Sequence, residues 1–501
     1  MKTNTLDFDA QALRDKILDL AMRGKLVPQD PNDEPASVLL EKIKAEKAEL
    51  VKEKKIKKSK PLPEITDDEK PFDIPDSWEW VRLGEVGNYI QRGRSPKYDK
   101  KNKSHPIISQ KCVQWENIYL KDAKYITKTF FDKLEDYRFV QENDVLWNST
   151  GTGTVGRLNI VKQNLDHIPV DSHVTLIRMN KQVNPDYIYY YLRSPEIQDN
   201  LNDYLTGTTK QKELGLTNIL KVKIPLPPLS EQSRIAAKIA QLFALLRKVE
   251  TSTQQYAKLQ TLLKSKVLDL AMRGKLVKQD PNDEPASVLL EKIKAEKAEI
   301  VKEKKIKKSK PLPPITDEEK PFDIPDSWEW VRLGNIVSYQ NGYAYKSSEL
   351  VKIRKGLPVI KSQNIMTLKV IIKDNNDYVK EPNEKMLNSK IIKGDLLMCL
   401  SSQSKNPEPL GKPAIYDLDK PALLNQRVLK LKLINHSMTD LIYYFINSSW
   451  FHFTVSHRGS GSGQSNLKLG DVMNMPIPVP PLNEEKHIVN RIEILFKKLS
   501  N

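Results

Sequence analysis

The pattern of apolar positions predicts two long helices in this chain of 501 residues. In two stretches, apolar residues recur at alternating intervals of four and three, which is the spacing of a coiled-coil seam. The first seam comprises Ile235, Ile239, Leu242, Leu246 and Val249, and the second comprises Ile488, Ile492, Leu495 and Leu499. The first continues more loosely through Tyr256, Leu259, Leu263 and Leu270, so we expect a central helix from about Ser230 to Met272. Ser230 and Asn483 are the expected N-caps of the two helices.

The second seam stops at Asn501, and its continuation is found near the other end of the chain. There Leu13, Ile17 and Leu20 stand in the positions that Leu263, Val267 and Leu270 occupy in the central helix. The two ends would therefore combine into one helical equivalent of the central helix. This predicts a circular arrangement with pseudo-twofold symmetry, in which the two seams most simply pack against each other.

Between the helices, short apolar segments alternate with polar loops, which is typical of strands. Two segments, "NDVLWNSTGTGTVGRLNIV" (143–161) and "KGDLLMCLSSQSKNPEPLGKPAIY" (393–416), each predict a strand, a polar loop and a second strand. Further along, "PDYIYYYL" resembles "MTDLIYYFI", and "GTTKQKELGLTNILKVKIPLPPL" matches "SGSGQSNLKLGDVMNMPIPVPPL". The expected fold class is therefore α+β, with two related β-rich α/β domains separated by long helices.

The chain also contains a long internal repeat. Residues Leu18–Gly84 and Leu268–Gly334 align without a gap over 67 positions and differ at four of them: Pro28/Lys278, Leu50/Ile300, Glu64/Pro314 and Asp68/Glu318. A recent duplication without functional meaning would explain the identity. Duplication of a whole half would, however, also have left the segments after Gly84 and Gly334 alike, and they differ. The flanks are thus kept identical while the middle segments vary.

No motif for chemistry within the chain is evident. Gly151, Gly153 and Gly156 fit a dinucleotide-binding glycine pattern, but "RLNIVKQ" follows as a strand where such a site needs a helix, so we interpret the glycines as a turn. A phosphate-binding loop, a methyltransferase loop, a nuclease carboxylate cluster and metal-ligand spacing are all missing from the sequence. Cys112 and Cys399 are expected to be reduced, buried thiols. We predict no catalytic residue, no bound metal and no cofactor in this chain.

The charge of the chain suggests an anionic partner. The formal net charge is +17, of which the Lys-rich segments 41–60 and 291–310 contribute +5 each. Such lysine-rich helical runs are usually solvated faces, so the basic variable segments 85–229 (+5) and 335–482 (+8) are better candidates for contact. No apolar run is long enough to span a membrane, and the first residues lack a secretion signal, so we expect a cytoplasmic protein without membrane contact.

The repeated elements resemble the specificity subunits of type I restriction–modification systems. The resemblance rests on "IPDSWEWVRLGEV" and "IPDSWEWVRLGNI" before each variable domain, and on "IPLPPLSEQSRIAAKI" and "PIPVPPLNEEKHIVNRI" after it. Between them lies a Gly-polar-Gln-x-x-Leu segment, with Gln211 and Leu214 matching Gln464 and Leu467. The resemblance covers essentially the whole chain. It departs from the simplest family members in the long repeated segment Pro28–Lys70.

The resemblance implies a non-catalytic subunit that reads double-stranded DNA. Two target-recognition domains would each read one half of a bipartite sequence, and an antiparallel coiled coil would space them. Its helices would dock two modification subunits, which methylate adenine with S-adenosylmethionine, and restriction subunits would supply the ATP- and Mg-dependent activities. Identical flanks suit two identical partners, and different middle segments suit two different half-sites. The alternative is a duplicated non-catalytic scaffold that presents two RNA- or peptide-binding domains.

The expected division of the chain is a shared helical region (1–70), a first target-recognition domain (71–229), a central helical region (230–320), a second target-recognition domain (321–482) and a C-terminal helix (483–501). Base reading is expected from loops that differ between the two domains, because they combine Arg, Lys, Asn and Gln. In the first domain the candidate DNA-binding residues are Arg92, Arg94, Lys97, Gln110, Lys111, Gln114, Asn148, Ser149, Thr150, Thr152, Lys210 and Gln211. In the second they are Tyr343, Tyr345, Lys346, Lys361, Gln363, Asn364, Ser402, Gln403, Lys405, Gln426, Arg427, Arg458 and Gln464. The residues of the two seams are the candidates for pairing and partner docking.

Overall fold

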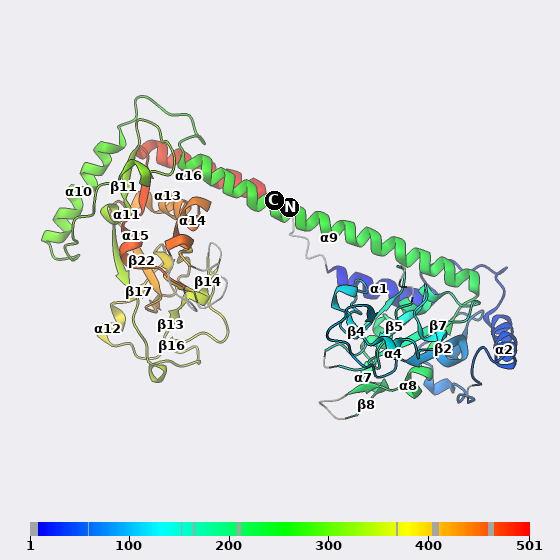
Figure 1. The fold of residues 1–501 in the computed structure, drawn as a ribbon. Coiled ribbons are helices and arrows are strands. Elements are labelled where there is room, and N and C mark those ends of the chain that lie inside the picture. The colour runs from blue at the N-terminus through cyan, green and yellow to red at the C-terminus, as the bar shows by residue number, and fades with distance from the viewer. Residues whose placement is uncertain are drawn as a thin grey trace. The chain divides into compact units, whose positions relative to one another are not determined.

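The computed structural model describes residues 9–58, 60–151, 153–163, 165, 167–207, 212–366, 369–402, 410–458 and 465–500. The chain divides into two compact units (Figure 1), a first that extends to Thr253 and a second that begins at Gln254. Each unit contains one copy of the internal repeat, one variable β-rich segment and part of a long helix.

The first unit is built around a four-stranded antiparallel sheet with the strand order β2-β7-β5-β6. A separate pair, β1 and β10, brings the entrance and the exit of the variable segment together, with Trp80 opposite Pro225. Its helices are α1 (Ala10–Met22), α2 (Ala36–Lys52), α3 (Leu83–Val86), α4 (Lys128–Phe131), α5 (Pro185–Leu192), α6 (Pro195–Gln198), α7 (Leu201–Tyr204), α8 (Leu216–Leu220) and the start of α9 (Leu229–Met272), with short 3₁₀ helices at Asp67–Glu69, Leu120–Asp122 and Asp136–Arg138. Its strands are β1 (Glu79–Arg82), β2 (Gly87–Arg92), β3 (His105–Ile107), β4 (Lys124–Ile126), β5 (Val145–Asn148), β6 (Leu158–Ile160), β7 (Val174–Met179), β8 (Leu205–Thr206), β9 (Glu213–Leu214) and β10 (Lys223–Leu226).

The second unit repeats this plan and adds a sheet. The order β12-β22-β18-β20 corresponds to the sheet of the first unit, and β11 pairs with β24 as β1 pairs with β10. Its helices are the end of α9, α10 (Ala286–Lys302), α11 (Leu333–Ile336), α12 (Glu384–Leu387), α13 (Thr439–Ile446), α14 (Ser449–Arg458), α15 (Leu469–Met473) and α16 (Leu482–Ser500), with 3₁₀ helices at Asp317–Glu319, Ser347–Glu349, Ser362–Asn364 and His436–Met438. Its strands are β11 (Glu329–Arg332), β12 (Val337–Asn341), β13 (Leu357–Ile360), β14 (Ile365–Met366), β15 (Lys369–Val370), β16 (Tyr378–Val379), β17 (Lys390–Ile391), β18 (Leu396–Cys399), β19 (Ser401–Ser402), β20 (Pro413–Ile415), β21 (Ala422–Leu424), β22 (Val428–Leu433), β23 (Ser465–Asn466) and β24 (Pro476–Val479). The additional sheet has the order β16-β13-β21-β17, with β13 parallel to β21.

The long central helix is confirmed, since α9 is a continuous helix of 44 residues. Its predicted N-cap is wrong, because α9 begins one residue before Ser230, and the backbone N–H of Gln232 donates to the carbonyl of Pro228. Likewise α16 begins at Leu482, before Asn483. Both polar side chains instead reach to the repeat: Ser230 Oγ bonds to Asp33, and Asn483 Nδ2 donates to Asp283.

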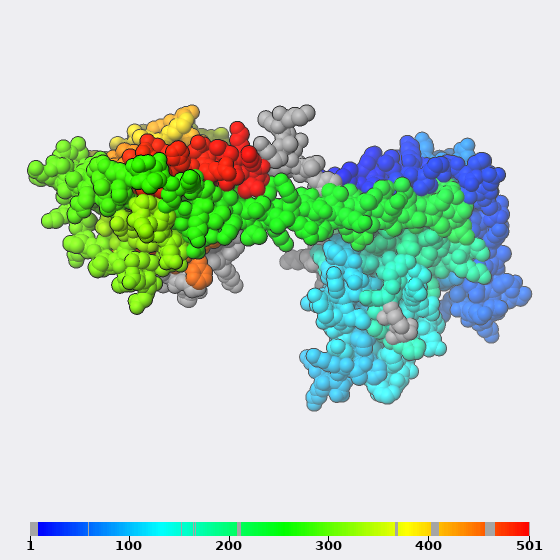
Figure 2. Space-filling model, turned by 90° about the horizontal axis from the view of Figure 1, so that it is seen from above, coloured from blue at the N-terminus to red at the C-terminus, as the bar shows by residue number. Residues whose placement is uncertain are grey.

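Each unit pairs a terminal helix with its own part of α9 in antiparallel fashion. In the first unit, α1 lies along α9, with Arg14 bonded to Glu250 and Gln29 bonded to Glu231 (Figure 2). In the second unit, α16 lies along α9, and Gln260 Nε2 donates a hydrogen bond to the backbone carbonyl of Leu499. The antiparallel direction follows from the numbering, which rises along one helix while it falls along the other.

The seam is buried only where these helices meet a domain core. Ile235, Ile239, Ile488 and Ile492 are fully buried, and Leu242, Leu246, Leu495 and Leu499 are partly buried. In contrast, Val249 is 45% exposed in the first unit, and Tyr256, Leu259 and Leu263 are 57%, 56% and 49% exposed in the second. The looser continuation of the seam is therefore exposed over this stretch, because the described parts of α1 and α16 leave these side chains uncovered.

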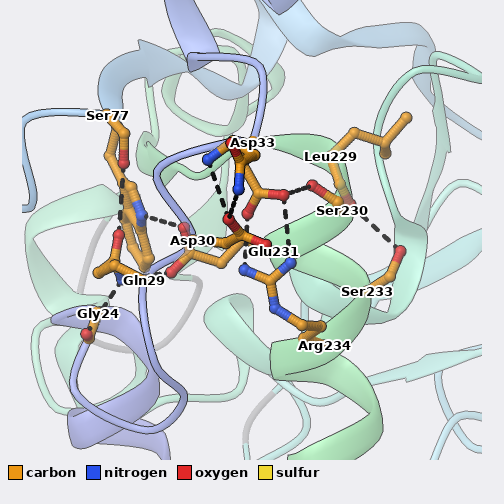
Figure 3. A network of polar contacts seen from close by, with 12 residues as sticks. Gly24, Gln29, Asp30, Asp33, Ser77, Leu229, Ser230, Glu231, Ser233 and Arg234 are labelled. Atoms are coloured by element: carbon orange, nitrogen blue, oxygen red, sulfur yellow. Dashed lines mark hydrogen bonds and ion pairs between the residues drawn. The ribbon is translucent and has the colours of Figure 1, made fainter.

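A partly buried polar network fixes the start of α9 to the internal repeat (Figure 3). The indole Nε1 of Trp78 donates to Glu231 Oε2 at 2.9 Å, and Gln29 donates to the other oxygen of that carboxylate. Arg234 forms an ion pair with Asp33 at 2.6 Å. Burial raises the pKa of Glu231, so the hydrogen bonds from Trp78 and Gln29 offset only part of the cost of removing this carboxylate from water.

In the lysine-rich helix of each repeat copy, one half-buried lysine bonds to the domain that the helix packs against. Lys47 Nζ donates to the carbonyls of Gly84, Glu85 and Gly87 at 2.9, 3.0 and 2.9 Å, where α3 ends. Lys297 makes the corresponding bonds to Gly334, Asn335 and Val337. Burial lowers the pKa of both lysines. Part of the basic charge of these segments is thus used to satisfy carbonyls at a helix end.

Candidate nucleic-acid interface

In the first unit, several of the variable loops converge where β2 and β5 end and β7 begins. Gly93 follows β2 and passes so close to the segment before β7 that a Cβ atom on it would lie 1.9 Å from the carbonyl oxygen of Val170. Arg94 then forms a bridge with Asp171. The 109–115 loop joins the same region through the bond from Asp171 N to the carbonyl of Ile108. The loops after β2, β3 and β5 are therefore neighbours.

Two of the predicted DNA-binding residues in this region support the loops from inside. Asn148 is buried, and its Nδ2 donates to the carbonyl of Gln110 at 2.9 Å. Ser149 is also buried, and its hydroxyl bonds to Thr175. In this structure both side chains position the loop and do not face solvent, since each is 0% exposed.

The accessible polar side chains of this region, exposed or half-buried, come from four different loops. Thr150 Oγ1 bonds to His173 Nδ1 at 2.6 Å and approaches Gln110 Oε1 at 3.5 Å. Arg94 is exposed, and its backbone bridges to Asp171, two residues before His173. Its side chain forms a surface ion pair with Glu135 at 2.8 Å. These donors and acceptors are the kinds of group that read base edges and phosphates. We define the first loop surface as Arg94, Gln110, Thr150 and His173.

The remaining candidates of the first domain have other surroundings. Arg92 is partly buried and is held by Glu213 and the carbonyl of Leu214. Gln114 bonds to Arg157 at 2.8 Å. Lys97 and Lys111 are exposed. Thr152, Lys210 and Gln211 lie outside the described residues.

The second unit has the same junction with different side chains. Gly342 approaches the carbonyl oxygen of Asn425, where an added Cβ would lie at 2.1 Å, and Tyr343 forms the bridge with Asn425. Tyr343 and Tyr345 pack with ring centroids 4.9 Å apart. Gln426 is exposed and Arg427 half-buried, and both directly precede β22. We define the second loop surface as Tyr343, Gln426 and Arg427.

The other candidates of the second domain are distributed around this junction. Asn364 is buried, and its Nδ2 donates to the carbonyl of Ile371 and to Asn376, so it holds the loop internally. Lys361 forms a half-buried pair with Asp377 at 2.5 Å. Lys346 and Gln363 are exposed, Ser402 ends β19, and Arg458 ends α14. Gln403, Lys405 and Gln464, together with the side chains of Ser402 and Arg458, lie outside the described part.

The hydrogen bonds that precede β7 and β22 identify two residues, Ser172 and His173, that the sequence analysis did not include. Asp171 accepts from His173 N at 2.9 Å, and Asn425 accepts from Arg427 N at 3.3 Å, so the same turn precedes β7 and β22. Ser172 and His173 therefore occupy the places of Gln426 and Arg427. The signal was present in the sequence, because "DSHVTLI" aligns with "NQRVLKL". We add His173 to the candidate set.

The electrostatics of the two junctions differ at this turn. Burial raises the pKa of Asp171, and its Oδ2 has no hydrogen-bond partner. In the second unit the neutral amide of Asn425 makes the equivalent turn. A buried carboxylate beside a DNA surface would repel phosphate when ionised. The electrostatic potential at the two turns therefore differs, although their backbones are similar.

The structure supports the interpretation of the glycine-rich segment as a turn. Its described residues connect β5 to β6, and Gly151, Gly153 and Gly156 have φ angles of 108°, 76° and 91°. Burial raises the pKa of the Cys112 and Cys399 thiols, so neither is an activated nucleophile. Among the described residues, no cluster of three or more His, Cys, Asp or Glu side chains could hold a metal ion, and no helix is both long and apolar enough to cross a membrane.

The comparisons with known proteins agree with this arrangement. The family "Type I restriction modification DNA specificity domain" matches residues 75–260 and 325–501, once in each half. The chain is 34% identical to the Type I restriction enzyme EcoAI specificity subunit of Escherichia coli, over 98% of this chain and 89% of that protein. It is 30% identical to the EcoEI specificity subunit of Escherichia coli, with the same coverage of 98% and 89%.

The fold is shared with a solved structure from work on the complex assembly and conformational transition of the type I R-M system. That likeness has a TM-score of 0.56 at 20% identity and covers 86% of this chain and 93% of that one. The comparisons favour DNA specificity over the alternative of an RNA- or peptide-binding scaffold. The chain belongs to the family of type I restriction–modification DNA specificity subunits, with two target-recognition domains.

Proposed function

We propose that each loop surface reads one half of a bipartite sequence in double-stranded DNA. The observation that supports this most strongly is the shared junction at Gly93 and Gly342. The same backbone framework carries Arg94 and His173 in one domain, and Tyr343 and Arg427 in the other. A shared backbone framework would place each domain on DNA in the same way, while the different side chains would read two different half-sites.

The chemistry of the two surfaces suits duplex DNA. Arginine can donate two hydrogen bonds to guanine or bind phosphate, and glutamine can bond to both edge atoms of adenine in the major groove. Histidine and threonine can bond to bases or phosphates. The basic variable segments, with net charges of +5 and +8, would also attract the DNA backbone.

The partners that we propose are two modification subunits and, in a restricting complex, restriction subunits. The modification subunits would bring S-adenosylmethionine and the adenine-methylating site, and the restriction subunits would bring ATP and Mg. The chain itself would supply sequence recognition and docking surfaces, in the cytoplasm. The near-identity of the two repeat copies supports two copies of one docking partner, because the same surface is then offered twice.

We further propose that α9 sets the distance between the two half-sites. Its 44 residues are continuous, so an insertion changes its length by a predictable amount. One heptad added between Val249 and Tyr256 would lengthen it by roughly 10 Å at ~1.5 Å per residue, or about three base pairs at ~3.4 Å each. Single-molecule sequencing of methylated DNA should then show the same half-sites farther apart.

The test of the proposed function compares the pure chain with its complex. Incubation of the chain alone with labelled S-adenosylmethionine and genomic DNA should give no incorporation. With the modification subunit added, label should appear in adenine, and sequencing should place it in one bipartite site. Label incorporated by the chain alone, or methylation of unrelated sequences by the complex, would contradict the proposal.

A further inference from the structure

The internal repeat forms the same surface groove in each unit. In the first unit the groove has a volume of about 500 Å³ and lies between the proline-rich 61–65 segment and the segment 72–80. In the second unit its counterpart has a volume of about 520 Å³. The lining positions common to both are identical except at two, where Pro314 replaces Glu64 and Asn335 replaces Glu85.

Aromatic rings form part of each groove. Trp80 packs edge-on against Phe72 with ring centroids 5.1 Å apart, and Trp330 packs against Phe322 at 5.2 Å. Trp80 and Trp330 are half-buried, so one part of each ring is supported by the fold while another faces the groove. Aliphatic contacts come from Leu62 and Ile74 and from their counterparts.

Two carboxylates that line both grooves lack an intramolecular partner. Asp76 and Glu79 are exposed and form no side-chain hydrogen bond or ion pair with the residues that the structure describes, and the same holds for Asp326 and Glu329. The cations of the groove are already paired. Lys70 is bound to Asp67 at 2.5 Å, and Lys320 is bound to Asp317 at 2.6 Å.

The buried arginine beside each groove is paired as well. Arg332 is 4% exposed and forms an ion pair with Glu319 at 2.6 Å, and Arg82 does the same with Glu69 at 2.8 Å. The charge that each groove presents to a partner is therefore negative. This distinguishes it from the rest of the chain, whose net charge is +17.

The chemistry of the groove selects a cationic protein segment. Unpaired carboxylates repel the phosphates of DNA, whereas they attract a Lys or Arg side chain. A tryptophan ring next to them can bind the same cation through its face, and the aliphatic side chains can cover the stem. Because both grooves share these features, one kind of segment would fit both.

We propose that the groove in each unit binds a Lys- or Arg-bearing segment of the modification subunit. The inference rests on the proposed docking of two such subunits and assigns a surface to it in the repeated segment, separate from the helical seams. It also explains why exposed residues of the groove are identical in the two copies, although the fold does not require them to be. Asp76 and Glu79, with Asp326 and Glu329, are the residues that bind the cation.

The test reverses these charges in the full chain and counts bound modification subunits by native mass spectrometry. Changing Asp76→Lys with Glu79→Lys should remove one subunit, and adding Asp326→Lys with Glu329→Lys should remove the second. Neutral variants, Asp76→Asn with Glu79→Gln, should weaken binding at the first groove by about tenfold. The matched control is Glu53→Lys with Glu303→Lys, which reverses exposed carboxylates of the same repeat outside the groove.

A second measurement identifies what occupies the groove. Glu79→Cys introduces an exposed thiol, whereas Cys112 and Cys399 are buried, so a photo-cross-linker can be attached at the groove alone. It should capture a basic peptide of the modification subunit. Cross-links only to DNA or to the chain itself, or wild-type binding of both subunits by the charge-reversed variant, would overturn the inference. Should the wild-type chain bind no modification subunit at all, the proposed function would fail, and the inference with it.

Discussion

The starts of α9 and α16 occupy the same place in the two units but are held by different polar groups. In the first unit, Gln232 accepts from the backbone N–H of Asn184 and donates to the carbonyl of Pro227, each at 2.8 Å. Its counterpart in the second unit is Glu485, which is 1% exposed and has an Oε2 without a hydrogen-bond partner. Where Arg234 pairs with Asp33, His487 stands in the second unit.

Other contacts at these helix starts are the same in both units. Trp328 donates to Glu484 at 2.9 Å, as Trp78 does to Glu231, and Gln279 donates to the second oxygen of Glu484 at 2.7 Å. The bonds from the Trp and Gln of each repeat copy to the first-turn carboxylate are therefore kept, whereas two neighbouring helix positions have changed: Gln232, which contacts the variable domain, and Arg234, which pairs with Asp33 of the repeat. Substitutions at the shared Trp–Glu contact should therefore act alike in both units, whereas those at the changed positions should affect one unit only.

The largest effect is expected from loss of the shared tryptophan. Trp78→Ala should destabilise the first unit by about 3–5 kcal/mol, because it removes a buried ring and leaves the Glu231 carboxylate without one donor. Trp328→Ala should do the same to the second unit. Hydrogen–deuterium exchange of β1 and β10, compared with β11 and β24, measures each unit separately.

Trp78→Phe is the matched control, since it keeps most of the apolar volume and removes only the hydrogen bond. Its loss should be smaller, about 1–3 kcal/mol. Equal exchange in both units after Trp78→Ala would show that the anchor is not local to the unit that contains it.

The changed position Glu485 should make the second unit sensitive to pH. Burial, with Asp440 nearby, raises the pKa of Glu485 from 4.5 to about 7, and Lys486 opposes this only partly. Between these values the unfolded chain releases the proton first, so stability should fall as the pH rises from 4.5 to about 7. The full difference corresponds to about 3 kcal/mol.

Glu485→Gln, which installs the residue of the first unit, should remove this pH dependence and stabilise the second unit above pH 7. The reciprocal Gln232→Glu should introduce the same dependence in the first unit. Urea unfolding followed by exchange at several pH values would measure both. A second unit whose stability does not change over this pH range would contradict the explanation.

Substitutions in the loop surfaces should act on one half-site each. Arg94→Ala should weaken DNA binding by about 1–3 kcal/mol if it removes a base contact, and Gln110→Ala should have an effect of the same size. Fluorescence anisotropy with duplexes in which one half-site is scrambled provides the control. The loss caused by Arg94→Ala should disappear with one scrambled half and persist with the other, whereas Tyr343→Ala should show the opposite pattern.

The smallest effect is expected at the ion pair that only the first unit contains. The Asp33 carboxylate is largely buried and the Arg234 side chain is 37% exposed, so solvent screens the pair from one side. Arg234→Ala should cost about 0.5–1 kcal/mol. The hydrogen bond from Arg234 lowers the pKa of Asp33, so this contribution should be lost in acid as that carboxyl protonates. A loss above about 2 kcal/mol in urea unfolding would mean that the pair is not screened.

The main helices and strands could be predicted from the sequence where apolar residues recur at a regular spacing. The four-three spacing from Ile235 predicted α9, and the strand that follows Gly156 predicted a turn instead of a nucleotide site. Local pattern also placed the loops that meet at Gly93 and Gly342. The helix starts were misplaced because Ser230 and Asn483 bond to distant aspartates, and such tertiary contacts have no local signal.

The extent of burial could not be predicted from the same patterns. Tyr256 and Leu259 continue the apolar period, but the described parts of the pairing helices do not cover them. Asn148, Ser149 and Asn364 have side chains suited to base reading, yet they are turned inward to hold loops. His173 was overlooked because histidine in a loop carries no signal until its counterpart, Arg427, is recognised.

The proposed function requires that each domain reads its own half-site through its own loop surface. The most direct measurement changes Arg94, Gln110, Thr150 and His173 to alanine together, assembles the complex and maps methylated adenines by single-molecule sequencing. One half of the recognised sequence should then become relaxed, while the other half and the spacing between them should stay the same. An unchanged sequence in a complex that still methylates, or the loss of both half-sites together, would contradict it.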